Sequence, residues 1–491
     1  MGLSARSLCV LALSGVWLAG GPATAQTLAD VLRGYEAEAL AANPALRARA
    51  FGVGVAEQDL AEARADGRPA LRFDSRLTRA EGGRTIDLPL GQLLNPAYDA
   101  LGEITGQPFP RLTDESIPLF RNESDSRVRL TVPLYAPRVG PAVRLREALL
   151  GAETVGVEAV RRDLVRDVRV GYLRVLQADR AASILRASEA LAAENLRASQ
   201  ALRRADRVIG AEVLRAEADV FAADRDRAGA VRDLDLASAS FNALLGRALD
   251  TPVVRPADFD TVDPPSPAGP TRTDVRLASA LRWSDAPLGR DSLDADSLGA
   301  LQDAAVAQRQ ELARLDAVIE ARVQAAALAS AAFRPTVGVS VEAGAQGSAV
   351  QGLFPDEPFV LASVGLSWEL ADGGRRRAQR ERARLEESRD RALREDAALQ
   401  IRLQVEQAVR GARVARAQIE ASEARLSAAR ERYRATTRLV AAGSANQVDA
   451  VDARTTLVAA ELAVNVDRYG LLIELARLDA ALGTPAPSSD R

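Results

Sequence analysis

Residues 401–440 read IRLQVEQAVRGARVARAQIEASEARLSAARERYRATTRLV, and small or apolar side chains recur along this stretch with heptad spacing. Two series of positions, each with a seven-residue period, together form the seam of a coiled coil. Most positions of the first series carry small residues, which predicts that the helix packs closely against its neighbour. The two series are Ile401, Ala408, Ala415, Ser422, Ala429 and Thr436, and Val405, Ala412, Ile419, Leu426, Tyr433 and Val440.

The helix that carries this seam extends well beyond it. No proline occurs between Phe359 and Thr484, and Ala, Leu, Arg and Glu are abundant there. Proline is excluded from helix interiors and these four residues favour helix, so the stretch predicts long helices. From Arg375 to Val440 the helix would run roughly 100 Å at about 1.5 Å per residue.

A tight turn is expected at Ala442, Gly443, Ser444, Ala445 and Asn446, where the heptad pattern stops. Gly443 suits the left-handed residue that ends many helices. A second helix would then return antiparallel to the first. The alternative is one unbroken helix.

An earlier copy of this pattern lies about 237 residues upstream. The stretch between Ala142 and Thr251 also lacks proline, and Leu244-Leu245-Gly246 aligns with Ala481-Leu482-Gly483. The turn at 442–446 aligns with a segment that starts at Asp206, a residue type that can adopt the left-handed conformation. An unbroken helix is the alternative here too. The first-copy turn comprises Asp206, Arg207, Val208, Ile209 and Gly210.

The duplication covers more than the long helices. Pro69 aligns with Pro335 at an offset of 266, and the offset then changes once, by 30 residues, between two strand-like runs. A duplicated fold tolerates an insertion that is confined to a loop. Each copy is therefore predicted to run helix, strand, loop, strand, long helix, tight turn, long helix.

The strand candidates alternate charged and apolar residues, as in residues 71–78 and 127–132, with second-copy counterparts at 336–344 and 359–370. Such alternation suits either a barrel wall with a wet lumen or a half-buried soluble sheet. Four strands cannot close a barrel of useful diameter, and lipid does not tolerate open sheet edges. Transmembrane strands would therefore require the chain to oligomerise.

The first 25 residues resemble a secretory signal peptide, with Arg6, an apolar run from Leu8 to Leu18 and small residues before Gln26. A membrane anchor is the alternative, but this run is too short to span a bilayer. The single cysteine, Cys9, lies within the signal, so disulfides and thiolate metal sites are not expected in the mature chain.

Composition argues against several classes of function. The chain has no histidine and no lysine, so it lacks the commonest general base and the commonest Schiff-base residue. Neither a Gly-rich phosphate loop nor a nucleophile elbow is present. The formal charge of −3, without a long basic block, makes nucleic acid an improbable partner. We expect no enzyme, and no catalytic, cofactor or metal site.

Over the whole mature chain, the sequence resembles the TolC family of outer-membrane efflux proteins. The motifs that carry the resemblance include the duplication and several short segments. They are Asn43-Pro44-Ala45-Leu46, the strand-to-helix run 364–375 (VGLSWELADGGR), its degenerate counterpart 132–138 (VPLYAPR), the turn-and-return segment 443–457 (GSANQVDAVDARTTL) and Ala480-Ala481-Leu482-Gly483.

The resemblance implies a mainly α protein with a small β part, in the cell outer membrane and extending into the periplasm. Three copies would build a 12-stranded outer-membrane β-barrel, continued by a periplasmic α-helical barrel. Family partners are a periplasmic adaptor protein and an inner-membrane transporter. The implied function is the exit duct of a tripartite efflux pump for small molecules. The alternatives are a duct for type I protein secretion and, from another class, a trimeric coiled-coil surface or scaffold protein without a pore.

The predicted segments follow from the duplication. They are a signal peptide at 1–25, periplasmic helices at 26–68, a β-hairpin with a long outer loop at 69–135, a long helical hairpin at 136–248 with its tip near 206–211, a Pro-rich linker at 249–305, a helix at 306–334, a second β-hairpin at 335–370, a second long helical hairpin at 371–484 with its tip near 442–448, and a tail at 485–491.

Acidic residues near the tips are the candidate site. By resemblance, Asp449 and Asp452 match two aspartates that ring the narrow periplasmic end of the family's tunnel, and Glu212 is the first-copy counterpart of Asp449. Residues three apart on a helix share a face. Such a ring would favour cations. The alternative role for Asp449 is an acid at a helix N-terminus, favoured by the helix dipole.

The two tips, 206–210 and 442–446, are the expected adaptor-docking surfaces. In the family, arginine and tyrosine can lock the closed entrance, but Ala445 and Val440 stand at the matching places here. Arg207 in the first copy is a possible substitute.

Overall fold

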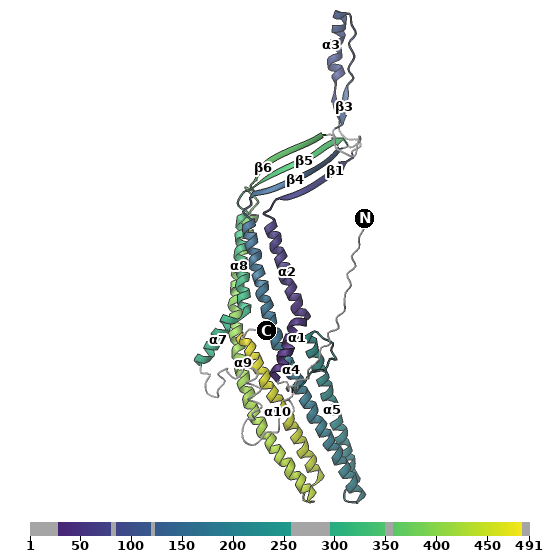
Figure 1. Cartoon of the computed structure of the whole chain (residues 1–491), viewed down its shortest axis with the longest axis vertical. Helices are drawn as coiled ribbons and strands as arrows, with labels where there is room; N and C mark the ends of the chain where they lie inside the picture. The colour runs from purple at the N-terminus through teal and green to yellow at the C-terminus, as the bar shows by residue number, and fades with distance from the viewer. Residues whose placement is uncertain (1–27, 80–84, 119–122, 257–294, 349–356, 484–491) are drawn as a thin grey trace, which may run out of the picture. The chain divides into compact units, whose positions relative to one another are not determined.

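The computed structural model describes residues 28–79, 85–118, 123–256, 295–348 and 357–483 (Figure 1). The predicted signal peptide, most of the predicted linker and the predicted tail lie outside these residues. The chain divides into two compact units. Unit 1 comprises residues 1–50, 156–312 and 397–491, and unit 2 comprises residues 51–155 and 313–396.

The duplication predicted from sequence is confirmed element by element, because the two members of each helix pair start and end at the same offset to within one residue. In the first copy these elements are α1 (Leu28–Ala42), α2 (Pro44–Ala65), α4 (Val139–Arg204) and α5 (Gly210–Leu245). In the second copy they are α7 (Ala295–Gln308), α8 (Gln310–Ala331), α9 (Arg375–Ala441) and α10 (Gln447–Leu482). The last helix of each copy ends at a left-handed glycine, Gly246 or Gly483.

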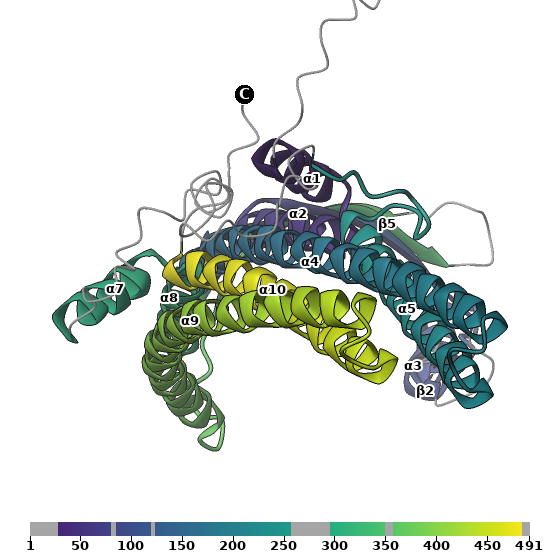
Figure 2. The ribbon, with the colours of Figure 1, turned by 90° about the horizontal axis from the view of Figure 1, so that it is seen from below.

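Within unit 1, the long helices form two antiparallel hairpins, α4 with α5 and α9 with α10 (Figure 2). Ion pairs mark the antiparallel register in each hairpin. Arg227 on α5 pairs with Glu189 on α4 at 2.7 Å, and Arg468 on α10 pairs with Glu423 on α9 at 2.6 Å. The prediction of a break between two helices, rather than one unbroken helix, is confirmed in both copies.

The heptad seam on α9 is buried as predicted. Val405 is fully buried, Leu426 is 3% exposed, and every other seam position is buried or half-buried. Small residues such as Ala408 and Ala412 bring neighbouring helices close together, and burial of this apolar stripe stabilises the hairpin.

An aromatic cluster lies in the buried core of unit 1. Tyr35, Tyr172 and Phe241 contact one another with ring centroids 5.0–5.6 Å apart, which joins α1, α4 and α5. Both tyrosine hydroxyl groups are satisfied, because Tyr172 donates to the Val254 carbonyl and Tyr35 accepts from the Val254 amide. Buried tyrosines are tolerated when their hydroxyl groups find such partners.

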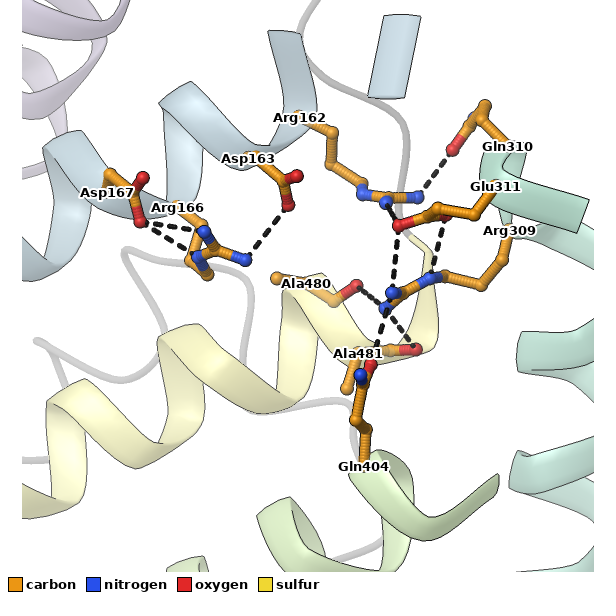
Figure 3. A network of polar contacts seen from close by, with 10 residues as sticks. All are labelled: Arg162, Asp163, Arg166, Asp167, Arg309, Gln310, Glu311, Gln404, Ala480 and Ala481. Atoms are coloured by element: carbon orange, nitrogen blue, oxygen red, sulfur yellow. Dashed lines mark hydrogen bonds and ion pairs between the residues drawn. The ribbon is translucent and has the colours of Figure 1, made fainter. Parts of the chain in front are cut away.

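A polar network in the same unit joins the start of α8 to three other helices (Figure 3). Arg162 on α4 donates to Gln310 and pairs with Glu311. Arg309 also pairs with Glu311, and it donates to the carbonyl oxygens of Ala480 and Ala481 at the end of α10. The network therefore supplies a side-chain donor to the end of α10, where the Ala480 carbonyl also accepts from the Gly483 amide.

Unit 2 contains a four-stranded antiparallel sheet in the order β1-β4-β5-β6. The strands are β1 (Ala70–Thr78), β4 (Glu123–Tyr135), β5 (Thr336–Ser348) and β6 (Glu357–Ser367), which confirms the two predicted strand pairs. The copies are joined by pairing between β4 and β5, for example Leu130 with Val341.

The two faces of this sheet differ in chemistry. Leu71, Leu130 and Val341 lie directly opposite one another on one face, and their exposed fractions are 72%, 37% and 37%. On the other face, Glu342 on β5 pairs with Arg127 and Arg129 on β4. One face is thus bare and largely apolar, and the other carries charges.

The sequence predicted a long outer loop between β1 and β4, and the structure shows regular elements within it. It contains a two-stranded ladder, β2 (Thr85–Leu88) with β3 (Glu115–Pro118), and helix α3 (Leu90–Thr105) between them. Pro96 and several glycines suggested a loop, but contacts with the following segment hold the helix. We call residues 85–118 the insert module.

The ion pairs have one chemical feature in common. Each ion pair described here uses an arginine guanidinium as its cation, because the sequence contains neither lysine nor histidine.

None of the helices within the described ranges is long and apolar enough to cross a membrane.

Candidate functional site

The two helical tips in unit 1 share one backbone geometry. In the first tip, the Asp206 amide donates to the Arg203 carbonyl and the Arg207 amide donates to Leu202. In the second, the Gly443 amide donates to Val440 and the Ser444 amide donates to Leu439. This paired pattern is the Schellman motif, which closes a helix through one left-handed residue.

The left-handed residues themselves differ between the copies. Gly443 has φ 75°, which glycine adopts without a steric penalty. Asp206 has φ 54°, and it is the one residue other than glycine with a positive φ in the described part of the chain. The prediction that Asp206 would supply the turn in the first copy is therefore confirmed.

The return helices begin differently. Asn446 caps α10, because its side chain accepts from the Asp449 amide at 2.9 Å and the Asp449 carboxylate accepts from the Asn446 amide at 3.2 Å. This reciprocal pair is a capping box. In the first copy, Ile209 stands at the N-cap without a side-chain hydrogen bond, and Glu212 lies in the first turn.

The helix-terminus role weighed for Asp449 is thus confirmed. The capping role is compatible with a place in the predicted constriction ring, because the Asp449 side chain remains exposed at the tip. The structure places Asp449 and Asp452 in the first two turns of α10 and Glu212 in the first turn of α5, on different hairpins. Membership of a constriction ring stays a prediction.

Sequence reasoning missed two arginines beside these acids. Arg432 on α9 pairs with Asp452 at 2.7 Å, and both side chains are more than half exposed. Arg454 on α10 is only 9% exposed, and its Nε and Nη1 atoms have no hydrogen-bond partner among the described residues. Counting residues outward from the turn at 442–446 places Arg432 beside the first turns of α10 but does not single out Asp452 as its partner.

The tips are accessible in the single chain. Residues 442–444 and 446 are exposed and Ala445 is half-buried, and in the first tip Ile209 is 65% exposed. Within the described residues, no group of three or more acidic, histidine or cysteine side chains is placed to hold a metal ion.

Solved outer-membrane channels share this architecture. The chain is similar to the CmeC channel of Campylobacter jejuni, with a TM-score of 0.69, 13% identity and coverage of 98% of this chain and 94% of that one. It is also similar to the open-state MtrE channel of Neisseria gonorrhoeae, with a TM-score of 0.67, 17% identity and coverage of 94% and 92%. A membrane protein from Pseudomonas aeruginosa is similar as well, with a TM-score of 0.70, 19% identity and coverage of 94% of each chain.

The fold is therefore that of an outer-membrane channel subunit. No curated protein matches the chain in sequence. Residues 301–484, the second copy, match the family described as "Outer membrane efflux protein". The match to this family covers the second copy alone, and the likeness to the solved channels extends over nearly the whole chain as a likeness of fold.

Proposed function

We propose that three copies of this chain form an outer-membrane channel, the exit duct of a tripartite efflux pump. The observation that carries the proposal is the sheet of unit 2, which ends at two strands, β1 and β6, that are paired on one side only. Pairing of β6 with β1 of the next copy would leave no open edge in lipid. Three sheets would then give a closed 12-stranded barrel.

The chemistry of the two sheet faces supports this arrangement. Phe73, Val360 and Val364 are 68–77% exposed in the single chain, which suits a lipid-facing wall. The opposite face, with Arg127, Arg129 and Glu342, would line a wet lumen. A half-buried soluble sheet would leave the apolar face without a cover.

The proposed duct is a passive conduit rather than an enzyme. It would accept small molecules from an inner-membrane transporter through a periplasmic adaptor and release them outside. The hairpins α4–α5 and α9–α10 would form the periplasmic tunnel, with the tips 206–210 and 442–446 at its inner end. Asp449, Asp452 and Glu212 of three copies would then surround one entrance.

The charge of that entrance depends on Arg432. Exposed ion pairs are worth little in stability, but a guanidinium beside Asp452 offsets the potential that this carboxylate creates. Asp449 has no such cation among its described contacts, since its carboxylate accepts from the Asn446 amide. We therefore expect Asp449 to contribute more to cation selectivity than Asp452.

Planar-bilayer recordings of the purified full-length protein test the function. We expect ion conductance with a preference for cations, which Asp449→Asn with Asp452→Asn lowers and Arg432→Ala raises. The double variant should also weaken block by trivalent cations. Asp396→Asn, an exposed acid far from the tips in sequence, is the control and should change selectivity less.

Two results would contradict these assignments. A trimer that inserts in bilayers but never conducts would argue for the scaffold protein without a pore. Conductance with unchanged selectivity in the double variant would remove Asp449 and Asp452 from the constriction.

Cysteine crosslinking tests the proposed partner surface. Ser444→Cys, at an exposed tip residue, should crosslink to the adaptor in whole cells. Thr78→Cys, exposed at the end of β1, is the matched control and should give no adaptor crosslink. Crosslinks at Thr78 and none at Ser444 would invert the proposed topology.

The substrate class is tested by a deletion strain. We expect loss of resistance to dyes, detergents and antibiotics, with full recovery when the gene is restored. A strain that keeps its resistance but stops exporting a protein would instead identify a duct for type I secretion.

A further inference from the structure

Helix α3 of the insert module is held in place through its polar side. The Asp114 carboxylate accepts from the Gly91 and Gln92 amides at 2.9 and 3.3 Å, so the return segment caps the start of the helix. Asn95 exchanges two hydrogen bonds of 2.8 Å with the backbone of Leu112. Gly91 permits this approach, because a Cβ atom there would lie 2.5 Å from the Leu112 carbonyl oxygen.

Two side-chain contacts complete this attachment. Arg111 donates twice to the Asp99 carboxylate, at 3.0 and 3.1 Å, and Tyr98 stacks on Phe109 with centroids 5.9 Å apart. The side of α3 that faces its own return segment is therefore occupied. A left-handed Gly106 then ends the helix.

The opposite side of α3 is apolar and bare. At about 100° per residue, six of its apolar positions fall within an arc of about 100°, the width of a core-facing stripe, and Ala100 lies just beside this arc. Leu93 is 68% exposed and Ile104 is 82% exposed, although such residues normally face a core. We call this set the α3 stripe; it consists of Leu90, Leu93, Leu94, Ala97, Leu101 and Ile104.

The spacing of the stripe favours another helix as its cover. Leu90, Ala97 and Ile104 recur every seven residues, and Leu93 and Leu94 lie between them, as at the a, d and e positions of a heptad. A lipid surface fits less well, because interfacial helices are rich in Lys and Arg on the polar side. The insert module carries five carboxylates against a single arginine, Arg111.

We propose that the α3 stripe packs against the α3 stripes of the other two copies of this chain, as a three-helix cluster. The proposal rests on the trimer proposed above, which brings three insert modules to one mouth of the channel. Two heptads make a weak coiled coil alone, but the trimer raises the effective concentration of the three helices. Asp99 and Glu103 lie away from the stripe, so the helices can meet without opposing carboxylates.

Disulfide crosslinking in outer-membrane fractions tests the contact, because the chain has no cysteine beyond Cys9 in the predicted signal peptide. Ile104→Cys and Leu101→Cys should form covalent dimers on mild oxidation. Glu103→Cys, the adjacent residue on the polar side, is the matched control and should crosslink several-fold less. Leu93→Ser combined with Ile104→Cys should lower the yield, and since Leu93 is exposed the change should leave folding intact.

The native mass of the same samples separates the two proposals. A monomeric protein would overturn the proposed channel. A trimer that gives equal yields at positions 103 and 104, or none at either, would overturn the α3 cluster alone. A spin label at position 104 that reports lipid contact and no neighbouring label would assign the stripe to the membrane surface instead.

Discussion

Glu311 shows how one carboxylate can organise several helices. It pairs with Arg162, which is 4% exposed, and with Arg309, whose guanidinium also satisfies the end of α10. Burial raises the pKa of Glu311, but its own backbone amide and the two arginines outweigh burial and hold the pKa below the ordinary value of 4.5. The ionised form is therefore the one that the folded protein stabilises.

The pH dependence of stability follows from this direction. A lowered pKa means that Glu311 contributes stability above pH 4.5, and that this contribution is lost as the pH falls through the folded-state pKa. Glu311→Gln should lower the free energy of unfolding near neutral pH by about 2 kcal/mol, because it leaves Arg162 buried without its ion pair. It should also flatten the acid side of a plot of Tm against pH.

The matched control is Glu158→Gln, which removes a more exposed carboxylate paired with Arg161 at 3.5 Å. Pairs of this kind contribute about 0.5 kcal/mol or less. An equal loss of stability in both variants would show that the network around Glu311 has no special role.

At the scale of elements, the long helices could be predicted because one periodic pattern runs unbroken for many turns. Helix α9 starts and ends within one residue of the limits expected from the heptads, and its seam is buried. Helix α3 was missed because Pro96 and nearby glycines in a short segment are typical of loops. Its apolar spacing was the available signal.

The seam on α9 should govern the stability of the second hairpin. Leu426→Ala should lower the free energy of unfolding by about 2–4 kcal/mol, because a side chain that is 3% exposed leaves a cavity. Denaturant unfolding followed by far-UV circular dichroism measures the loss. Ser427→Ala, exposed on the same turn, should change it by less than about 0.5 kcal/mol. Similar losses in the two variants would contradict the proposed seam.

At the scale of the whole molecule, the order of elements could be read from the duplication, but their partners could not. Hydrogen bonds between β4 and β5 join residues more than 200 positions apart, such as Leu130 and Val341. Alternation of apolar and charged residues along a strand shows which residues share a face. It does not show which strand lies beside that strand in the sheet. The proposed entrance ring would require other copies of the chain, so neither the sequence nor one subunit can show it.

The insert module should be dispensable for the channel. The equivalent connection between β5 and β6 covers only residues 349–356, and neither β2 nor β3 belongs to the four-stranded sheet. Replacing residues 85–118 by a short Gly-Ser linker should therefore leave outer-membrane fractionation, trimer mass and conductance in place. Failure of this variant to reach the outer membrane, with Ser427→Ala as an unaffected control, would show that the module is needed for assembly.

The arginine-only ion pairs determine how the protein behaves in alkali. Guanidinium groups keep their charge above pH 12, whereas a lysine ammonium begins to lose its charge near pH 10. An alkaline carbonate wash would therefore leave these ion pairs charged. If the wash released the protein from the membrane, the cause would be weak membrane association and not deprotonation of its ion pairs. Amine-reactive dyes would meet no side-chain amine, since the sequence has no lysine, and would attach only at the chain's α-amino group.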